Sequence, residues 1–151
     1  MRLKAHISAF RESDDGEETR IGRRIPAITT QFRADFSLDI EATRKVAAAL
    51  VADGVSGLIA CGTVGENNAL SRDEKLAVME VLKDAAGGRI PVIAGVAEYT
   101  TAQARELALE AQRLCIDGLM VLPAIVYSAK PRETLAHFRT IASASDLPIM
   151  I

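Results

Sequence analysis

The chain has 151 residues, of which 49% are hydrophobic and 25% are charged, and 18 Lys+Arg against 20 Asp+Glu give it a formal net charge of -2. This is the composition of a soluble globular domain, and its scattered basic residues give no charge footprint for a nucleic acid or an anionic membrane. Aromatic residues make up only 4% and tryptophan is absent, which argues against base-stacking platforms and leaves small aliphatic residues to fill the core.

Residues 1–24 mix basic and acidic side chains without a helical or strand period, so we expect a mobile leader there. The leader has no hydrophobic core of a signal peptide, and no apolar run in the chain approaches the roughly 18 residues that a membrane-spanning helix needs. From Ile25 onward, short apolar runs alternate with longer amphipathic stretches, which is typical of βαβ units. We therefore expect one domain over residues 25–151 and no contact with a membrane.

Five apolar runs are expected to form parallel strands. They cover residues 25–29, 57–61, 90–95, 118–122 and 147–151. Their starts recur about every 30 residues, the size of a βαβ unit. The chain stops on the last run without a cap, a turn or a polar tail, and this ending favours a fragment of a longer protein.

The stretches between the runs carry signals for four helix starts. The signals are Asp39, Ser71 with Glu74, Thr100 with Gln103, and Pro131. The two Ser/Thr pairs have the spacing of a capping box, and proline suits the first turn of a helix. Each helix is expected to pack one apolar face on the sheet.

Parallel strands separated by helices fit either an open doubly wound sheet of flavodoxin type or an eight-stranded barrel of roughly 250 residues. Length favours the doubly wound sheet. In both folds ligands bind at the carboxyl ends of the strands, so the residues directly after each apolar run are the candidates for function.

Two glycines follow the second run, in the segment GTVGE at 62–66. They let the backbone turn tightly and offer N–H groups to a small anion such as a carboxylate. The hydroxyl of Thr63 could donate to a bound oxyacid or relay a proton from it. The same segment also fits an ordinary βα turn in which Glu66 and Asn67 are solvated. Patterns of phosphate and dinucleotide loops are absent.

Tyr99 and Tyr127 are the only tyrosines, and they follow the third and fourth runs. Two phenols at neighbouring strand ends could relay protons, or could be half-buried packing residues in loops. His6 in the leader and His137 in the last helical stretch are expected to face solvent. No metal-binding pattern is present, and we expect neither a metal nor a cofactor.

Cys61 and Cys115 have the spacing of neither a disulfide framework nor a zinc site, so a reducing cytoplasm fits the chain best. Cys61 is expected to be buried and inert.

Schiff-base chemistry needs a neutral amine, which desolvation in an apolar strand would favour. All five lysines are instead interpreted as leader, helix-surface or loop residues. They are Lys4, Lys45, Lys75, Lys83 and Lys130.

Five segments carry a family resemblance: IPAITTQF at 25–32, GTVGENNALSRDEK at 62–75, RIPVIAGV at 89–96, GLMVLPA at 118–124 and HFRTIASASDLPIMI at 137–151. In this order and spacing they resemble the dihydrodipicolinate synthase and N-acetylneuraminate lyase family of class I aldolases. The resemblance implies an α/β fold, the N-terminal part of a TIM (β/α)8 barrel with about four βα units and a fifth strand.

The resemblance also implies a lyase in which pyruvate, or the pyruvoyl end of a 2-keto acid, forms a Schiff base with a lysine on strand six, beyond Ile151. Thr63 matches the family's proton-relay threonine, and the segment Thr63, Val64, Gly65 matches its carboxylate-binding loop. Val64 replaces a second threonine, and the family's tyrosine pair is missing after Pro123. These departures favour the branch that acts on keto-deoxy sugar acids by dehydration or aldol cleavage.

A homo-oligomer is expected as well, because homotetramers are usual in the family. The alternative is a non-catalytic half barrel that binds a keto acid weakly or pairs with another half as a structural partner.

Overall fold

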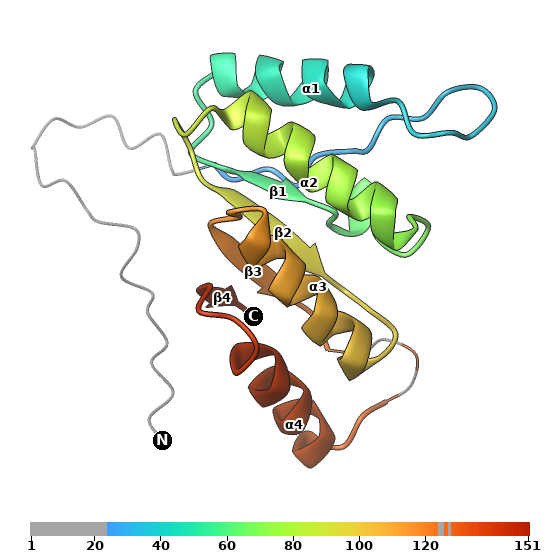
Figure 1. The fold of residues 1–151 in the computed structure, drawn as a ribbon, viewed down its shortest axis with the longest axis vertical. Helices are drawn as coiled ribbons and strands as arrows, with labels where there is room; N and C mark the ends of the chain where they lie inside the picture. The colour runs from blue at the N-terminus through green and yellow to red at the C-terminus, as the bar shows by residue number, and fades with distance from the viewer. Residues whose placement is uncertain (1–23, 124–125, 127) are drawn as a thin grey trace, which may run out of the picture.

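The computed structural model describes residues 24–123, 126 and 128–151, which form a four-stranded parallel sheet with helices between the strands (Figure 1). The strands are β1 (Leu58–Ala60), β2 (Val92–Val96), β3 (Gly118–Val121) and β4 (Ile149–Met150). The helices are α1 (Ile40–Ala52), the 3-10 helix η2 (Thr63–Gly65), α2 (Arg72–Ala86), α3 (Thr101–Arg113) and α4 (Pro131–Ala142). The leader expected over 1–24 lies outside the described residues except for Arg24.

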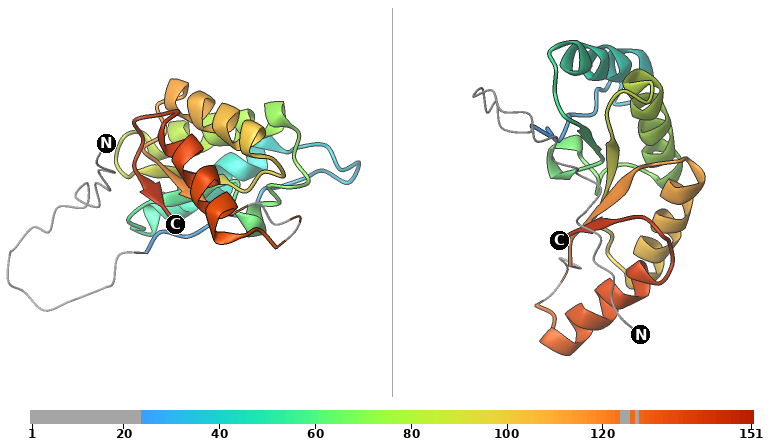
Figure 2. Two further views of the ribbon diagram at one scale, coloured as in Figure 1. Left: turned by 90° about the horizontal axis from the view of Figure 1, so that it is seen from below. Right: turned by 90° about the vertical axis from the view of Figure 1, so that its left-hand side faces the viewer.

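The order of the strands decides between the two expected architectures. Neighbours in the sheet follow the chain, β1-β2-β3-β4, and every pair is parallel. Figure 2 shows α1, α2, α3 and α4 on one side of the curved sheet. A doubly wound sheet reverses its strand order and carries helices on both faces, whereas a (β/α)8 barrel has sequential strands inside an outer ring of helices. The doubly wound sheet that the chain length favoured is therefore wrong. The chain folds as part of a barrel, as the family resemblance implied.

The first expected strand is only partly formed. Residues 25–29 make a single parallel bridge, between Ala27 and Ile59. Ile28 N–H donates to Ile59 O at 3.1 Å and Ile59 N–H donates to Pro26 O at 2.9 Å. Cys61 then leaves the strand direction with φ of 53°, so the pairing cannot continue toward the carboxyl end. The other four runs form strands, each shorter than expected.

The helices begin where the sequence signals place them. Their N-caps are Asp39, Ser71, Thr100 and Lys130. At α2 the capping box is complete, because Ser71 Oγ accepts from Glu74 N–H at 3.3 Å and Glu74 Oε2 accepts from Ser71 N–H at 2.8 Å. These bonds hold the pKa of the Glu74 carboxyl below its ordinary value. Pro131 is the first residue of α4, where its missing N–H costs nothing.

The core lies between the sheet and the helices and is built largely from small side chains. Leu58, Val92 and Leu119 contribute from three strands, and Met79 and Leu82 contribute from α2. Seven alanines of the described residues are fully buried: Ala47, Ala60, Ala86, Ala94, Ala104, Ala108 and Ala111. Such small residues let the helices approach the sheet closely. No helix in the described part of the chain is long and apolar enough to cross a membrane.

Candidate functional site

The candidate residues after the strands gather at one edge of the sheet. Because β1, β2 and β3 are parallel, the segments that begin at Gly62, Ala97 and Leu122 leave the sheet at the same edge. In barrels of this kind that edge carries the ligand-binding loops. The structure therefore brings the turn at 62–66 and the segment that contains Tyr99 to the same end of the molecule.

The turn at 62–66 is a short 3-10 helix that leaves two amides free. Gly65 N–H donates to Gly62 O at 3.0 Å and Glu66 N–H donates to Thr63 O at 3.1 Å. The first two N–H groups of such a helix, here those of Thr63 and Val64, have no acceptor within it. The side chains of Thr63 and Val64 are exposed, and that of Val64 is 56% exposed. This face of the turn can therefore offer N–H groups and a hydroxyl to a small acid.

The opposite side of the turn packs tightly on the segment that pairs with β1. A Cβ on Gly65 would lie 2.9 Å from Ile28 O, so only glycine allows this approach. Thr30 Oγ1 donates to Gly65 O at 2.7 Å from a buried position. Gly65 thus contributes backbone shape, while its own N–H is used inside the turn.

Cys61 forms the corner between β1 and the turn. Its φ of 53° directs its carbonyl over β2, where a Cβ on Gly95 would lie only 2.3 Å from Cys61 O. Burial raises the pKa of the Cys61 thiol to about 12. The thiol therefore stays protonated at neutral pH, in agreement with the expectation of a buried and inert cysteine.

Lys75 is buried, contrary to its interpretation as a helix-surface residue. Lys75 is 6% exposed, and its Nζ lies 2.6 Å from Glu98 Oε1. The residue stands on the buried face of α2 with Val78 and Met79. In the sequence, Lys75 precedes Val78 by three positions and Met79 by four, so the three residues lie on one face of the helix. This spacing is the sequence signal that could have predicted the burial of Lys75.

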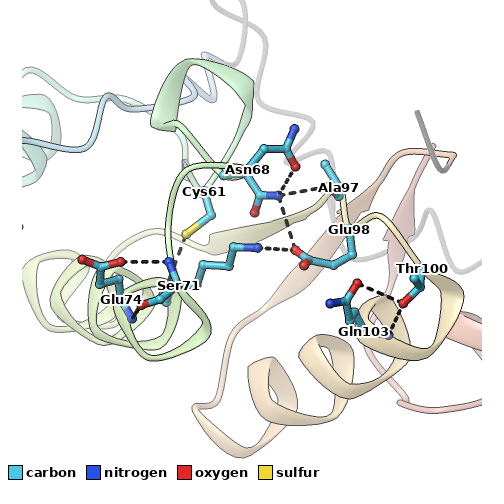
Figure 3. Close-up of polar contacts among 10 residues, drawn as sticks. Cys61, Asn68, Ser71, Glu74, Ala97, Glu98, Thr100 and Gln103 are labelled. Atoms are coloured by element: carbon cyan, nitrogen blue, oxygen red, sulfur yellow. Dashed lines mark hydrogen bonds and ion pairs between the residues drawn. The ribbon is translucent and has the colours of Figure 1, made fainter. Parts of the chain in front are cut away.

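Asn67, which directly follows the turn, is buried as well, and the alternative in which it is a solvated loop residue is wrong. The residue is 1% exposed, while Glu66 before it is exposed. Asn67 Nδ2 donates to Ala97 O at 3.2 Å and to Glu98 Oε1 at 3.3 Å. Figure 3 shows Glu98 and Ala97 facing the segment that follows the turn. We call Asn67, Lys75 and Glu98 the buried cluster.

The structure places one of the two candidate tyrosines. Tyr99 follows β2 and is 52% exposed. Tyr127 lies outside the described residues. A proton relay through either phenol stays a prediction.

His137 does not face solvent as expected. It is 5% exposed, its Nδ1 lies 2.9 Å from Thr101 Oγ1, and its Nε2 lies 3.1 Å from Leu122 O. The imidazole thereby joins α4 to the start of α3 and the end of β3, beside an open pocket of about 220 Å³ that Pro123 and Glu133 also line. In the described part of the chain, no three metal-ligating side chains cluster together.

Comparisons with known proteins agree on one family. The sequence model of the Dihydrodipicolinate synthetase family matches residues 20–151. The 4-hydroxy-tetrahydrodipicolinate synthase of Moorella thermoacetica is 41% identical over 132 residues, which are 86% of this chain and 44% of that protein. This chain thus spans less than half the length of that relative.

Solved structures give the same picture. The N-acetylneuraminate lyase from Mycoplasma synoviae superposes with a TM-score of 0.80 at 30% identity, covering 84% of this chain and 44% of the lyase. YagE, a prophage protein of the dihydrodipicolinic acid synthase family from E. coli K12 in complex with pyruvate, gives a TM-score of 0.80 at 29% identity and covers 83% and 42%. The parallel sheet described here is therefore similar to part of these larger folds.

Proposed function

The chain belongs to the dihydrodipicolinate synthetase family, and on that premise we propose that it supplies the carboxylate-binding turn of a lyase that acts on pyruvate or another 2-keto acid. The observation that carries the proposal is the turn itself, which presents the N–H groups of Thr63 and Val64 beside the Thr63 hydroxyl at the ligand-binding edge of the sheet. Thr63, Val64 and Gly65 are the proposed contact residues, and Thr63 is the proposed proton-relay residue.

The proposed reaction runs through a Schiff base between the keto group and a lysine that lies beyond this chain. Condensation releases water and gives an imine, and protonation of the imine nitrogen gives an iminium ion whose positive charge stabilises a carbanion at the adjacent carbon. The lysines of this chain suit the role poorly. The amines of Lys75 and Lys83 are already engaged in ion pairs, with Glu98 and Asp117 respectively. Lys130 is exposed in a loop before α4.

The substrate class that we propose is a keto-deoxy sugar acid or a similar 2-keto acid, cleaved or dehydrated. Val64 offers an exposed apolar surface where the family resemblance implies a second hydroxyl. We place the protein in the cytoplasm as a homo-oligomer. The alternative, a non-catalytic half barrel that binds a keto acid or pairs with another half, predicts the same turn without turnover.

Titration of the ¹⁵N-labelled chain with pyruvate tests this binding role. We expect the amide resonances of Thr63 and Val64 to shift in a saturable way, because the carboxylate takes their free N–H groups as donors. Pyruvamide, which lacks the carboxylate, is the matched control and should leave these resonances in place. If pyruvate shifts other amides only, or none, the turn does not bind the carboxylate and the proposal fails.

A further inference from the structure

We propose that the buried cluster positions the turn at 62–66 against the end of β2, and thereby sets where Thr63 stands relative to a bound 2-keto acid. This inference rests on the proposed function of the turn. Asn67, Lys75 and Glu98 are positioning residues in this account, because they act on the substrate only through the turn.

The buried cluster connects three segments at the carboxyl end of the strands, where ligands bind in barrels of this kind. Asn67 directly follows the turn, Lys75 lies in the first turns of α2, and Glu98 follows β2. One carboxylate oxygen, Glu98 Oε1, accepts from Lys75 Nζ at 2.6 Å and from Asn67 Nδ2 at 3.3 Å. The Asn67 amide also donates to a backbone carbonyl, Ala97 O, at 3.2 Å. Glu98 thus holds both ends of the segment between the turn and α2.

The burial of the ion pair indicates a role other than net stability. The side chains of Lys75 and Glu98 are only 7% and 13% exposed. Desolvation of two buried charges offsets most of their attraction, so apolar residues of similar volume often give an equally stable fold. Lys75 occupies a place in the buried stripe of α2 where a methionine would pack. A charged pair at this position is better explained by a role in fixing the geometry of the turn than by a contribution to the stability of the core.

The backbone of the turn needs this support. Cys61 and Glu66, at its two ends, adopt left-handed φ angles of 53° and 59°. Non-glycine residues hold such angles only when their surroundings over-determine them. On one side Thr30 Oγ1 anchors Gly65 O, and on the other side Asn67 connects the turn to the segment after β2. Loss of the cluster should therefore let the turn relax while the helices and the sheet stay folded.

The double variant Lys75→Met/Glu98→Leu tests this inference, because it removes the pair without leaving a lone buried charge. We expect an unfolding midpoint close to that of the unsubstituted chain. We also expect about tenfold faster hydrogen exchange at the protected amides of residues 65–67 and about tenfold weaker pyruvate binding at Thr63. Lys83→Met is the control, since its ion pair with Asp117, also 2.6 Å long, involves the same helix away from the turn. The Lys83→Met variant should change neither the hydrogen exchange at residues 65–67 nor the pyruvate binding at Thr63.

Each outcome decides the question. Unchanged exchange and unchanged pyruvate binding in the folded double variant would overturn the positioning role while leaving the proposed function intact. Failure of the unsubstituted chain to bind pyruvate at Thr63 would overturn both. If the double variant does not fold, Asn67→Leu, which keeps the ion pair, replaces it: faster exchange at residues 65 and 66 supports the inference, and unchanged exchange overturns it.

Discussion

Glu98→Gln should lower the free energy of unfolding by about 3–5 kcal/mol, as expected when one partner of a buried ion pair is removed. The substitution keeps the size of the side chain but leaves the Lys75 ammonium in a site where it is 6% exposed and has lost its charged partner. Urea denaturation followed by circular dichroism measures the change, which should appear as a lower midpoint at an unchanged slope.

The exposed pair of Arg44 and Asp84 provides the comparison for that loss. Its atoms lie 3.4 Å apart and its side chains are 41% and 67% exposed, so Asp84→Asn should cost less than about 1 kcal/mol. The double variant at Lys75 and Glu98 should recover most of the stability that Glu98→Gln loses. Equal effects of Glu98→Gln and Asp84→Asn would contradict this expectation and show that the pair of Lys75 and Glu98 is solvated in solution.

Thr63→Val should slow catalysis by roughly 10²-fold or more in a preparation that contains the reactive lysine, because a positioned proton donor and acceptor contributes about that factor. The valine has nearly the shape of threonine and lacks only the hydroxyl. A direct readout is exchange of the pyruvate methyl protons with deuterated solvent, which proceeds through the enamine form of the Schiff base and needs no second substrate.

Thr63→Ser is the matched control for this experiment, because it restores a hydroxyl at the same backbone position. We expect the serine variant to exchange the methyl protons within about tenfold of the unsubstituted rate. A valine variant that exchanges as fast as the serine variant would remove Thr63 from the mechanism and leave it as a contact residue only.

The local elements of this fold could be predicted because their signals lie within a few residues of one another. The capping box from Ser71 to Glu74 spans four residues, and Pro131 marks the start of α4 by its own covalent geometry. The apolar runs likewise indicate the strands. Such signals do not say on which face of the sheet each helix packs, so length alone wrongly favoured the open sheet. The family resemblance, in contrast, implied the part of a barrel that the sequential parallel strands confirm.

The buried polar residues could not be predicted in this way, because their partners are distant in the chain. Lys75 and Glu98 are 23 residues apart, and Thr101 and His137 are 36 residues apart. A pattern of helical surface positions therefore predicted solvent for Lys75 and His137 alike. For Lys75, the apolar residues on the same face of α2 indicate burial. The hydrogen bonds of His137, in contrast, depend on how α4 docks against β3.

Borohydride trapping with pyruvate, followed by peptide mass spectrometry, identifies which lysine, if any, forms the Schiff base. It should be run on this 151-residue chain and on any longer product read in frame from the same gene. We expect no specific labelling of this chain, with Lys75 held by Glu98 and Lys130 exposed to water, and labelling of a single later lysine in a longer product. Specific, pyruvate-dependent labelling of Lys75 or Lys130 in this chain would contradict it.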